Sequence, residues 1–148
     1  MTAWQDNLIQ DQAGIAQLLA DVQTVAVLGI RSEKMAEMPT HYVAAYLASA
    51  GLTVIPVPVY EPNATRILDR PVYQSLAAIP GPVDLIDIFR RPGDLPGHLE
   101  DILAKKPKAV WFQSGIRNDA VAEQLAKAGI KVVQNRCLMV EHRNAART

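Results

Sequence analysis

The sequence predicts an α/β fold: a single doubly wound, mostly parallel five-stranded sheet of the Rossmann-like type, with helices on both faces. Five short apolar segments lack polar alternation, which is typical of strands buried on both faces of a parallel sheet. Helical segments alternate with these strands, as right-handed crossovers require. The chain has 148 residues, enough for one core. We therefore expect residues 1–148 to form one domain, with its core at about 24–143.

The chain is expected to open with an amphipathic helix over about residues 8–21. Apolar side chains at Ile15, Leu18, Leu19 and Val22 follow the spacing of one helix face. Such a face buries its apolar stripe against a sheet, so this helix is expected to pack across the strands that follow.

A β–α–β unit follows this helix. Residues 24–29 form a continuously apolar, β-branched run, which predicts the first strand. Pro39 is expected to open the next helix. An N–H in the first turn of a helix has no partner within the helix, so proline, which lacks this N–H, is tolerated there. Gly51 ends that helix by permitting a left-handed backbone, and residues 52–57 supply the second strand.

The second half repeats this alternation. Asn118 is suited to cap a helix N-terminus, because its side chain accepts a hydrogen bond from the first turn. The connection at 60–79 contains several prolines and is predicted to be irregular, with a short helix at about 75–79. The remaining predicted elements are strands at 83–89, 109–112 and 130–133 and helices at 95–103, 118–128 and 139–147.

Composition excludes several classes of function. The formal net charge is zero, whereas nucleic acids and acidic membranes select basic surfaces, so neither is an expected partner. Cys137 is the only cysteine, which excludes an internal disulfide and a cysteine-built zinc site, and no histidines have metal-ligand spacing. The polar N-terminus and the lack of a long apolar run predict a cytoplasmic protein. A small molecule is the expected partner, and a protein partner is left open.

The residues that follow the strands indicate an anion site. In an open parallel sheet, ligands bind beyond the carboxyl ends of the strands, where the strand order reverses. Arg31 and Lys34 follow the first strand, Arg90 and Arg91 the third, and Arg117 the fourth. Helix N-termini at the same edge add partial positive charge. The sequence therefore predicts that this edge binds an anionic ligand.

The sequence contains no recognisable catalytic constellation. The loop at 29–34 lacks the G-x-G-x-x-G pattern of dinucleotide-binding loops, and no nucleotide-triphosphate loop or nucleophile turn occurs. Asp84 and Asp87 are three residues apart in a strand, which places them on opposite faces rather than in an acid pair. We therefore expect no catalytic residue and no metal site. The alternative is an enzyme or redox sensor that uses NAD or another nucleotide on the same fold.

Six motifs in order carry a resemblance to a known family. They lie at 25–29, 39–43, 54–58, 82–91, 110–116 and 136–142. Together they resemble the small stand-alone CoA-binding proteins of bacteria and archaea, whose fold is similar to the CoA-binding domain of the succinyl-CoA synthetase α subunit. The resemblance extends over residues 24–143.

The resemblance implies that coenzyme A lies across the strand ends. Its phosphates would meet the loop at 29–34 and the start of the Pro39 helix, where His41 either donates to a phosphate or packs. Glu33 and Glu37 are expected to face solvent. The implied contact residues are Gly29, Ile30, Arg31, Ser32, Lys34, Pro39, His41, Val57, Pro58, Phe89, Arg90, Arg91, Gln113, Gly115 and Ile116. The expected function is non-catalytic binding of coenzyme A or acyl-CoA, as a carrier, a sensor or the detached subunit of an acyl-CoA enzyme.

Overall fold

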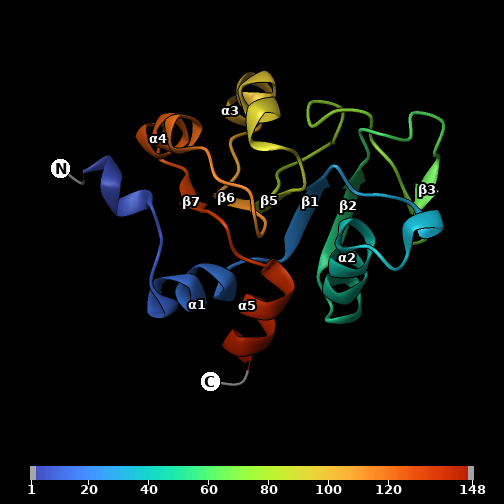
Figure 1. Ribbon diagram of the computed structural model, residues 1–148, viewed down its shortest axis with the longest axis horizontal. Helices are drawn as coiled ribbons and strands as arrows, with labels where there is room; N and C mark the ends of the chain where they lie inside the picture. Colours follow the sequence, from blue (N-terminus) through green and yellow to red (C-terminus); the bar gives the residue numbers. More distant parts are fainter. Residues whose placement is uncertain (1–2, 147–148) are drawn as a thin grey trace.

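A five-stranded parallel sheet forms the centre of the protein, with strand order β2-β1-β5-β6-β7 (Figure 1). The computed structural model describes residues 3–146. The strands of this sheet are β1 (Thr24–Leu28), β2 (Thr53–Val57), β5 (Leu85–Ile88), β6 (Ala109–Phe112) and β7 (Lys131–Val133). Each neighbouring pair runs parallel, so the predicted sheet is confirmed.

Helices cover both faces of the sheet. They are α1 (Gln12–Ala20), α2 (Pro39–Ser49), α3 (Leu99–Lys105), α4 (Asp119–Lys127) and α5 (Leu138–Ala146). Apolar residues of α1, α2 and α5 join one core cluster, and those of α3 and α4 join the other (Figure 1). The doubly wound arrangement is therefore confirmed. Within residues 3–146, no helix is both long and apolar enough to cross a bilayer.

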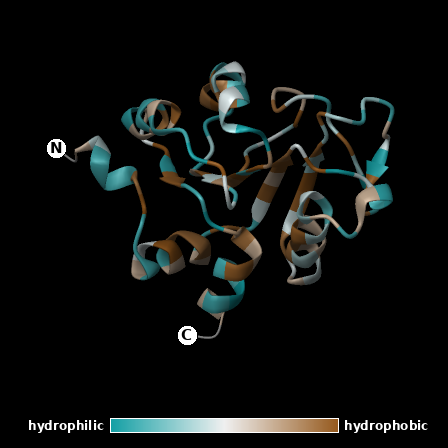
Figure 2. Cartoon of the chain, in the orientation of Figure 1, coloured by the Kyte–Doolittle hydropathy of each residue, from teal (hydrophilic) through white to brown (hydrophobic). Residues whose placement is uncertain are grey.

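The absence of polar alternation in the strands follows from this layering. In β1, Val25 and Val27 face one core cluster, whereas Ala26 and Leu28 face the other. Side chains of a strand point alternately to its two faces, so a strand covered on both faces is apolar throughout. Figure 2 shows the strands of the sheet coloured largely as hydrophobic, whereas the surrounding helices carry both hydrophobic and hydrophilic residues.

The opening helix begins at Gln12, so the prediction of a start near residue 8 was wrong. Asp11 caps α1 by accepting a hydrogen bond from the Gly14 N–H. Before this cap, Leu8 forms a parallel bridge with Val132 at the edge of β7. The cap and the edge pairing supply hydrogen-bond partners for backbone groups at residues 8–14, so these groups do not need a longer helix.

The segment at 95–103 also differs from the prediction of one helix. Residues Pro92–His98 form a 3-10 helix, and α3 begins only at Leu99. Pro96 lies inside the 3-10 segment, and a proline there has no N–H to donate to an α-helical ladder. The predicted final helix is α5, which begins at Leu138; its predicted last residue, Arg147, lies outside the described residues.

The connection at 60–79 contains a hairpin rather than only irregular chain. Strands β3 (Arg66–Ile67) and β4 (Arg70–Pro71) pair antiparallel, and both connecting residues, Leu68 and Asp69, have positive φ. Glycine and asparagine are the usual residues in such a turn, so the sequence carried no signal for it. The predicted short helix at 75–79 is wrong, because these residues form a turn closed by 3-10-type hydrogen bonds before Pro80.

Candidate ligand site at the carboxyl edge of the sheet

The strand order places a crevice beside the end of β1. The chain passes from β1 to β2 on one side, and β5 later pairs with β1 on the other. The direction of the strand order therefore reverses between β1 and β5. Ligands of open parallel sheets bind beyond the carboxyl ends of the strands at such a point.

Gly29 brings the ends of three strands together. Its N–H donates to the carbonyl oxygen of Val57 at 2.9 Å, and the Phe89 N–H donates to the carbonyl oxygen of Leu28 at 2.9 Å. The φ of Gly29 is 93°. A Cβ on this residue would lie 2.3 Å from the Phe89 carbonyl oxygen. Only glycine fits this backbone and this close approach.

The loop after β1 is fastened to the start of α2. The Arg31 N–H donates to the Thr40 carbonyl oxygen at 3.0 Å, and the ring of the buried His41 donates from Nδ1 to the Arg31 carbonyl oxygen at 2.9 Å. Ile30 is fully buried beneath the loop. The contact with Arg31 favours packing over phosphate donation for His41. Pro39 occupies the first turn of α2, as predicted.

Two arginines from different strand ends meet on one aromatic ring. The guanidinium carbon of Arg31 lies 5.2 Å from the ring centroid of Tyr60, and that of Arg90 lies 5.1 Å from it. Tyr60 belongs to the segment after β2, so one ring links the ends of β1, β2 and β5. Guanidinium groups at this distance are attracted to the face of an aromatic ring.

Acidic side chains hold both arginines in place. Arg31 Nε donates to Glu61 Oε1 at 3.0 Å, and Arg90 Nη2 lies 3.6 Å from Asp94 Oδ2. Arg90 Nε also donates to Nε2 of His98 at 3.1 Å. Burial, followed by the charge of Arg90, lowers the pKa of His98, which keeps this ring a neutral acceptor.

The two adjacent arginines differ in their surroundings. The side chain of Arg90 is 13% exposed, whereas that of Arg91 is 81% exposed and bonds only locally to Asp94 at 2.9 Å. Arg90 is therefore fixed beside the strand end, and Arg91 projects into solvent.

An open cavity of about 620 Å³ lies beside Arg31. Residues 60–66 line one side of it, and the other side is lined by Arg31, Ser32, Lys34 and Met35. Lys34 and Arg66 add positive charge to the lining, while the predicted exposure of Glu33 and Glu37 is confirmed. The cavity has the size of typical small-molecule sites. Val57 and Pro58 line a smaller neighbouring cavity of about 190 Å³.

The predicted residues after β6 are bonded to the segment that leads into α5. Gln113 is buried, and its Oε1 accepts from the Leu138 N–H at 3.0 Å. The Gly115 N–H donates to Oδ1 of Asn135 at 2.7 Å, and the N–H of Asn135 donates to the Ile116 carbonyl oxygen at 3.1 Å. These contacts hold the turn against the segment before α5, and the predicted contact of Gln113, Gly115 and Ile116 with coenzyme A stays a prediction.

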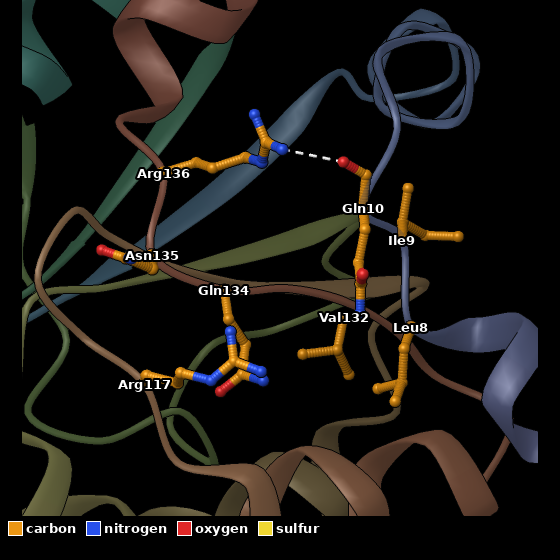
Figure 3. A pocket seen from close by; sticks show the side chains of 8 residues that line it. All are labelled: Leu8, Ile9, Gln10, Arg117, Val132, Gln134, Asn135 and Arg136. Carbon is orange, nitrogen blue, oxygen red and sulfur yellow. Dashed lines mark hydrogen bonds between the residues drawn. The ribbon is translucent and has the colours of Figure 1, made fainter.

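Arg117 lines a different cavity, of about 250 Å³, at the outer edge of β7 (Figure 3). Arg117 Nε lies 3.1 Å from Oδ1 of Asp119. Arg136, on the far side, donates to the Gln10 carbonyl oxygen at 2.7 Å, the contact drawn in Figure 3, and pairs with Glu141. The basic residues predicted at one edge therefore do not share one cavity: Arg31 and Lys34 line the first, Arg117 lines this one, and Arg90 and Arg91 line neither. The arginines in the linings of both cavities are paired with carboxylates.

Asp84 and Asp87 do not converge. Asp84 accepts hydrogen bonds from the Gln23 and Thr24 N–H groups at the amino end of the sheet. Burial raises its pKa, but the bonds to Thr24 and Gln23 and the nearby Lys108 outweigh burial and hold the pKa below its usual value. Asp87 is fully buried in β5 without a hydrogen-bond partner among the described residues, and burial raises its pKa well above its usual value. Asp87 thus lies in the core, apart from Asp84.

Sequence reasoning missed Tyr60, Glu61 and Asp94. All three lie just beyond strand ends, in segments without hydrophobic periodicity. Tyr60 carried one signal, because it is a large aromatic residue three positions after Val57, where the strand ends. Glu61 carried none, since its contact with Arg31 joins residues 30 positions apart.

Comparisons with known proteins agree with this fold. A family model described as a CoA binding domain matches residues 23–143. The uncharacterized protein YneT of Bacillus subtilis (strain 168) is 30% identical over 131 residues, 88% of this chain and 93% of YneT. A solved structure from Thermus thermophilus is 38% identical, with a TM-score of 0.85, and the match covers 92% of this chain and 99% of that one. The resemblance to CoA-binding proteins is confirmed.

The fold also occurs inside a larger enzyme. A dinucleotide forming acetyl-coenzyme A synthetase from Ca. Korarchaeum cryptofilum matches with a TM-score of 0.62 and 17% identity. The match covers 79% of this chain but 27% of the enzyme chain. At this identity the likeness concerns the fold alone.

Proposed function

The chain belongs to the CoA-binding domain family, and from that premise we propose that it binds coenzyme A or an acyl-CoA at the ends of β1, β2 and β5 without catalysing a reaction. The observation that carries the proposal is the pair of arginines, Arg31 and Arg90, on the Tyr60 ring beside an open cavity. This arrangement lies at the reversal point of the strand order, where such folds bind ligands.

The cavity lining fits the phosphates of coenzyme A. Arg31, Lys34 and Arg66 place three cationic side chains around one space. Guanidinium groups recognise phosphate oxygens through charge-assisted and often bidentate hydrogen bonds. The main-chain N–H of Ser32 lies in the same lining, where it donates to Oε2 of Glu61 at 3.0 Å. We assign the phosphates to this cavity.

The neighbouring smaller cavity fits a part of the ligand that has both apolar and polar groups. Leu28, Val57 and Pro58 contribute apolar surface at the ends of β1 and β2, and the lining also contains the polar side chains of Gln74, Ser75, His98 and Asp101. Its position beside the arginines supports assigning Val57 and Pro58 to the adenine or ribose. Coenzyme A itself supplies a thiol that carries acyl groups, and the protein's part is to hold the nucleotide portion.

The polar side chains around the cavity support binding rather than catalysis. Glu61 accepts from Arg31 and from the Ser32 N–H, and the Ser32 hydroxyl oxygen accepts from the Lys34 N–H. His98 accepts from Arg90. These groups hold the loops in place, which is consistent with a carrier, a sensor or the detached subunit of an acyl-CoA enzyme.

Coenzyme A is expected to raise the melting temperature more than NAD does. A ligand that binds only the folded state, at about 100 times its dissociation constant, adds roughly 2.7 kcal/mol of stability. For a chain of this size that corresponds to roughly 5–10 °C. Differential scanning fluorimetry with coenzyme A, acetyl-CoA and NAD over a concentration series measures the effect. Stabilisation by NAD at lower concentrations than coenzyme A would favour the alternative, an enzyme or redox sensor that uses NAD.

A further inference from the structure

The carboxylate of Glu61 occupies two donors of the cavity at once. Its Oε1 accepts from Nε of Arg31 and its Oε2 from the N–H of Ser32, each at 3.0 Å. The Glu61 side chain is 18% exposed and that of Arg31 is 29% exposed, so the pair is partly shielded from water. Glu61 comes from the segment after β2, whereas both donors belong to the loop after β1.

These two donors are the kind that a phosphate needs. A guanidinium N–H beside a main-chain N–H presents two hydrogen atoms to a pair of oxygens on one anion. The carboxylate of Glu61 supplies such a pair from within the chain. The same loop borders the cavity of about 620 Å³, so a ligand phosphate in this cavity would meet donors that are already occupied.

Glu61 is held in its charged form. Burial acts to raise its pKa, but the hydrogen bonds from Ser32 and Arg31 outweigh burial, and the pKa lies below its usual value. Near neutral pH the residue therefore presents a full negative charge to the loop. An incoming phosphate must either displace that charge or bind beside it against repulsion.

We propose that Glu61 acts as an internal competitor, a built-in anion that occupies the phosphate donors of Arg31 and Ser32 and is displaced by the phosphate of the ligand. The inference rests on the proposed function, since it concerns the same cavity. It makes Glu61 a determinant of affinity: the competing contact joins the two loops in the free protein and weakens ligand binding by the free energy needed to break it.

The neighbouring residue Tyr60 connects the displacement of Glu61 to the end of β5. Its ring contacts both Arg31 and Arg90, and it is directly bonded in sequence to Glu61. Release of Glu61 from Arg31 therefore loosens the segment that carries this ring. The displacement frees Arg31 and alters the ring against which Arg90 packs, while the contacts of Arg90 with His98 and Asp94 remain.

Replacing Glu61 with glutamine is expected to strengthen binding about tenfold. Glu61→Gln keeps the size of the side chain but removes its charge and one acceptor, and a hydrogen bond to a charged group contributes on the scale of a tenfold change in affinity. Isothermal titration calorimetry with coenzyme A and with inorganic pyrophosphate measures the dissociation constants. Glu61→Ala, which removes the carboxylate entirely, repeats the test, and circular dichroism checks that each variant folds.

Glu37→Gln is the matched control. Glu37 is an exposed acid in the loop after β1, so its replacement changes the net charge equally without touching the two donors. At physiological ionic strength its effect should stay below about twofold, because exposed charges are screened.

The outcomes separate this inference from the proposed function. If coenzyme A binds the wild type and Glu61→Gln binds it equally or more weakly, the competitor role is overturned while the proposed function stands. An equal gain in affinity in Glu37→Gln also overturns the competitor role, since the change in net charge would then explain the effect. If neither probe binds the wild type or any Glu61 variant, both proposals fail.

Discussion

Replacing Gly29 with alanine is expected to destabilise the protein by about 3 kcal/mol or more. The residue has a φ of 93°, which costs an L-residue about 1–2 kcal/mol. In addition, the new Cβ would lie 2.3 Å from the Phe89 carbonyl oxygen, so the ends of β1 and β5 would have to move apart. Denaturant unfolding monitored by circular dichroism measures the loss.

Gly51→Ala is the matched control for Gly29→Ala. Gly51 has a similar φ of 96°, but a Cβ there would meet nothing within 4 Å. The loss of stability in Gly51→Ala should reflect backbone strain alone, about 1–2 kcal/mol. The difference between the two variants then reports the close approach to Phe89, about 2 kcal/mol. Equal losses would show that the strand ends are not packed this closely.

Arg90→Ala is expected to weaken coenzyme A binding about tenfold or more. Arg90 is largely buried beside the end of β5 and contacts Tyr60, so it is held where the proposed ligand crosses the sheet. A charge-assisted hydrogen bond to a phosphate contributes roughly 1.5–3 kcal/mol, and each 1.4 kcal/mol is about tenfold in affinity. Calorimetric titration with coenzyme A measures the change, and the circular dichroism spectrum should remain that of the wild type.

Two variants with the same change in charge distinguish contact from diffuse attraction. Arg91 is adjacent but 81% exposed, and Arg143 lies in α5, where it contacts Tyr46. Arg91→Ala and Arg143→Ala should each weaken binding less than about threefold, and their effects should vanish at high salt. Equal losses in all three variants would remove Arg90 from the site.

The strands could be predicted because a strand that is buried on both faces is a continuous apolar run in the sequence. A strand such as β6 (Ala109–Phe112) is apolar at every position, and its predicted bounds are those of the structure. Helix ends were less predictable, since they depend on competing contacts. The cap by Asp11 and the pairing of Leu8 with Val132 shorten α1. Ile15, Leu18 and Leu19 of the predicted apolar stripe are buried in it, whereas Val22 lies beyond its end.

The candidate site was predictable only where it follows from topology. Arg31 and Arg90 follow strands that neighbour each other in the sheet, so strand order alone brings them close. Tyr60 and Glu61 lie in a connection whose path depends on tertiary contacts and on a hairpin turn at Leu68 with an unfavourable backbone conformation. Side-chain contacts across such distances in sequence have no local pattern.

Mapping the coenzyme A contacts by backbone amide chemical shifts tests the central claim most directly. On titration of the labelled protein with coenzyme A, we expect the largest changes within 29–34, 57–61 and 89–91, at the ends of β1, β2 and β5. Changes confined instead to Arg117 and Asn135, in the cavity beside β7 (Figure 3), would contradict the proposed site. No shift changes at all, at millimolar coenzyme A, would contradict the proposed function itself.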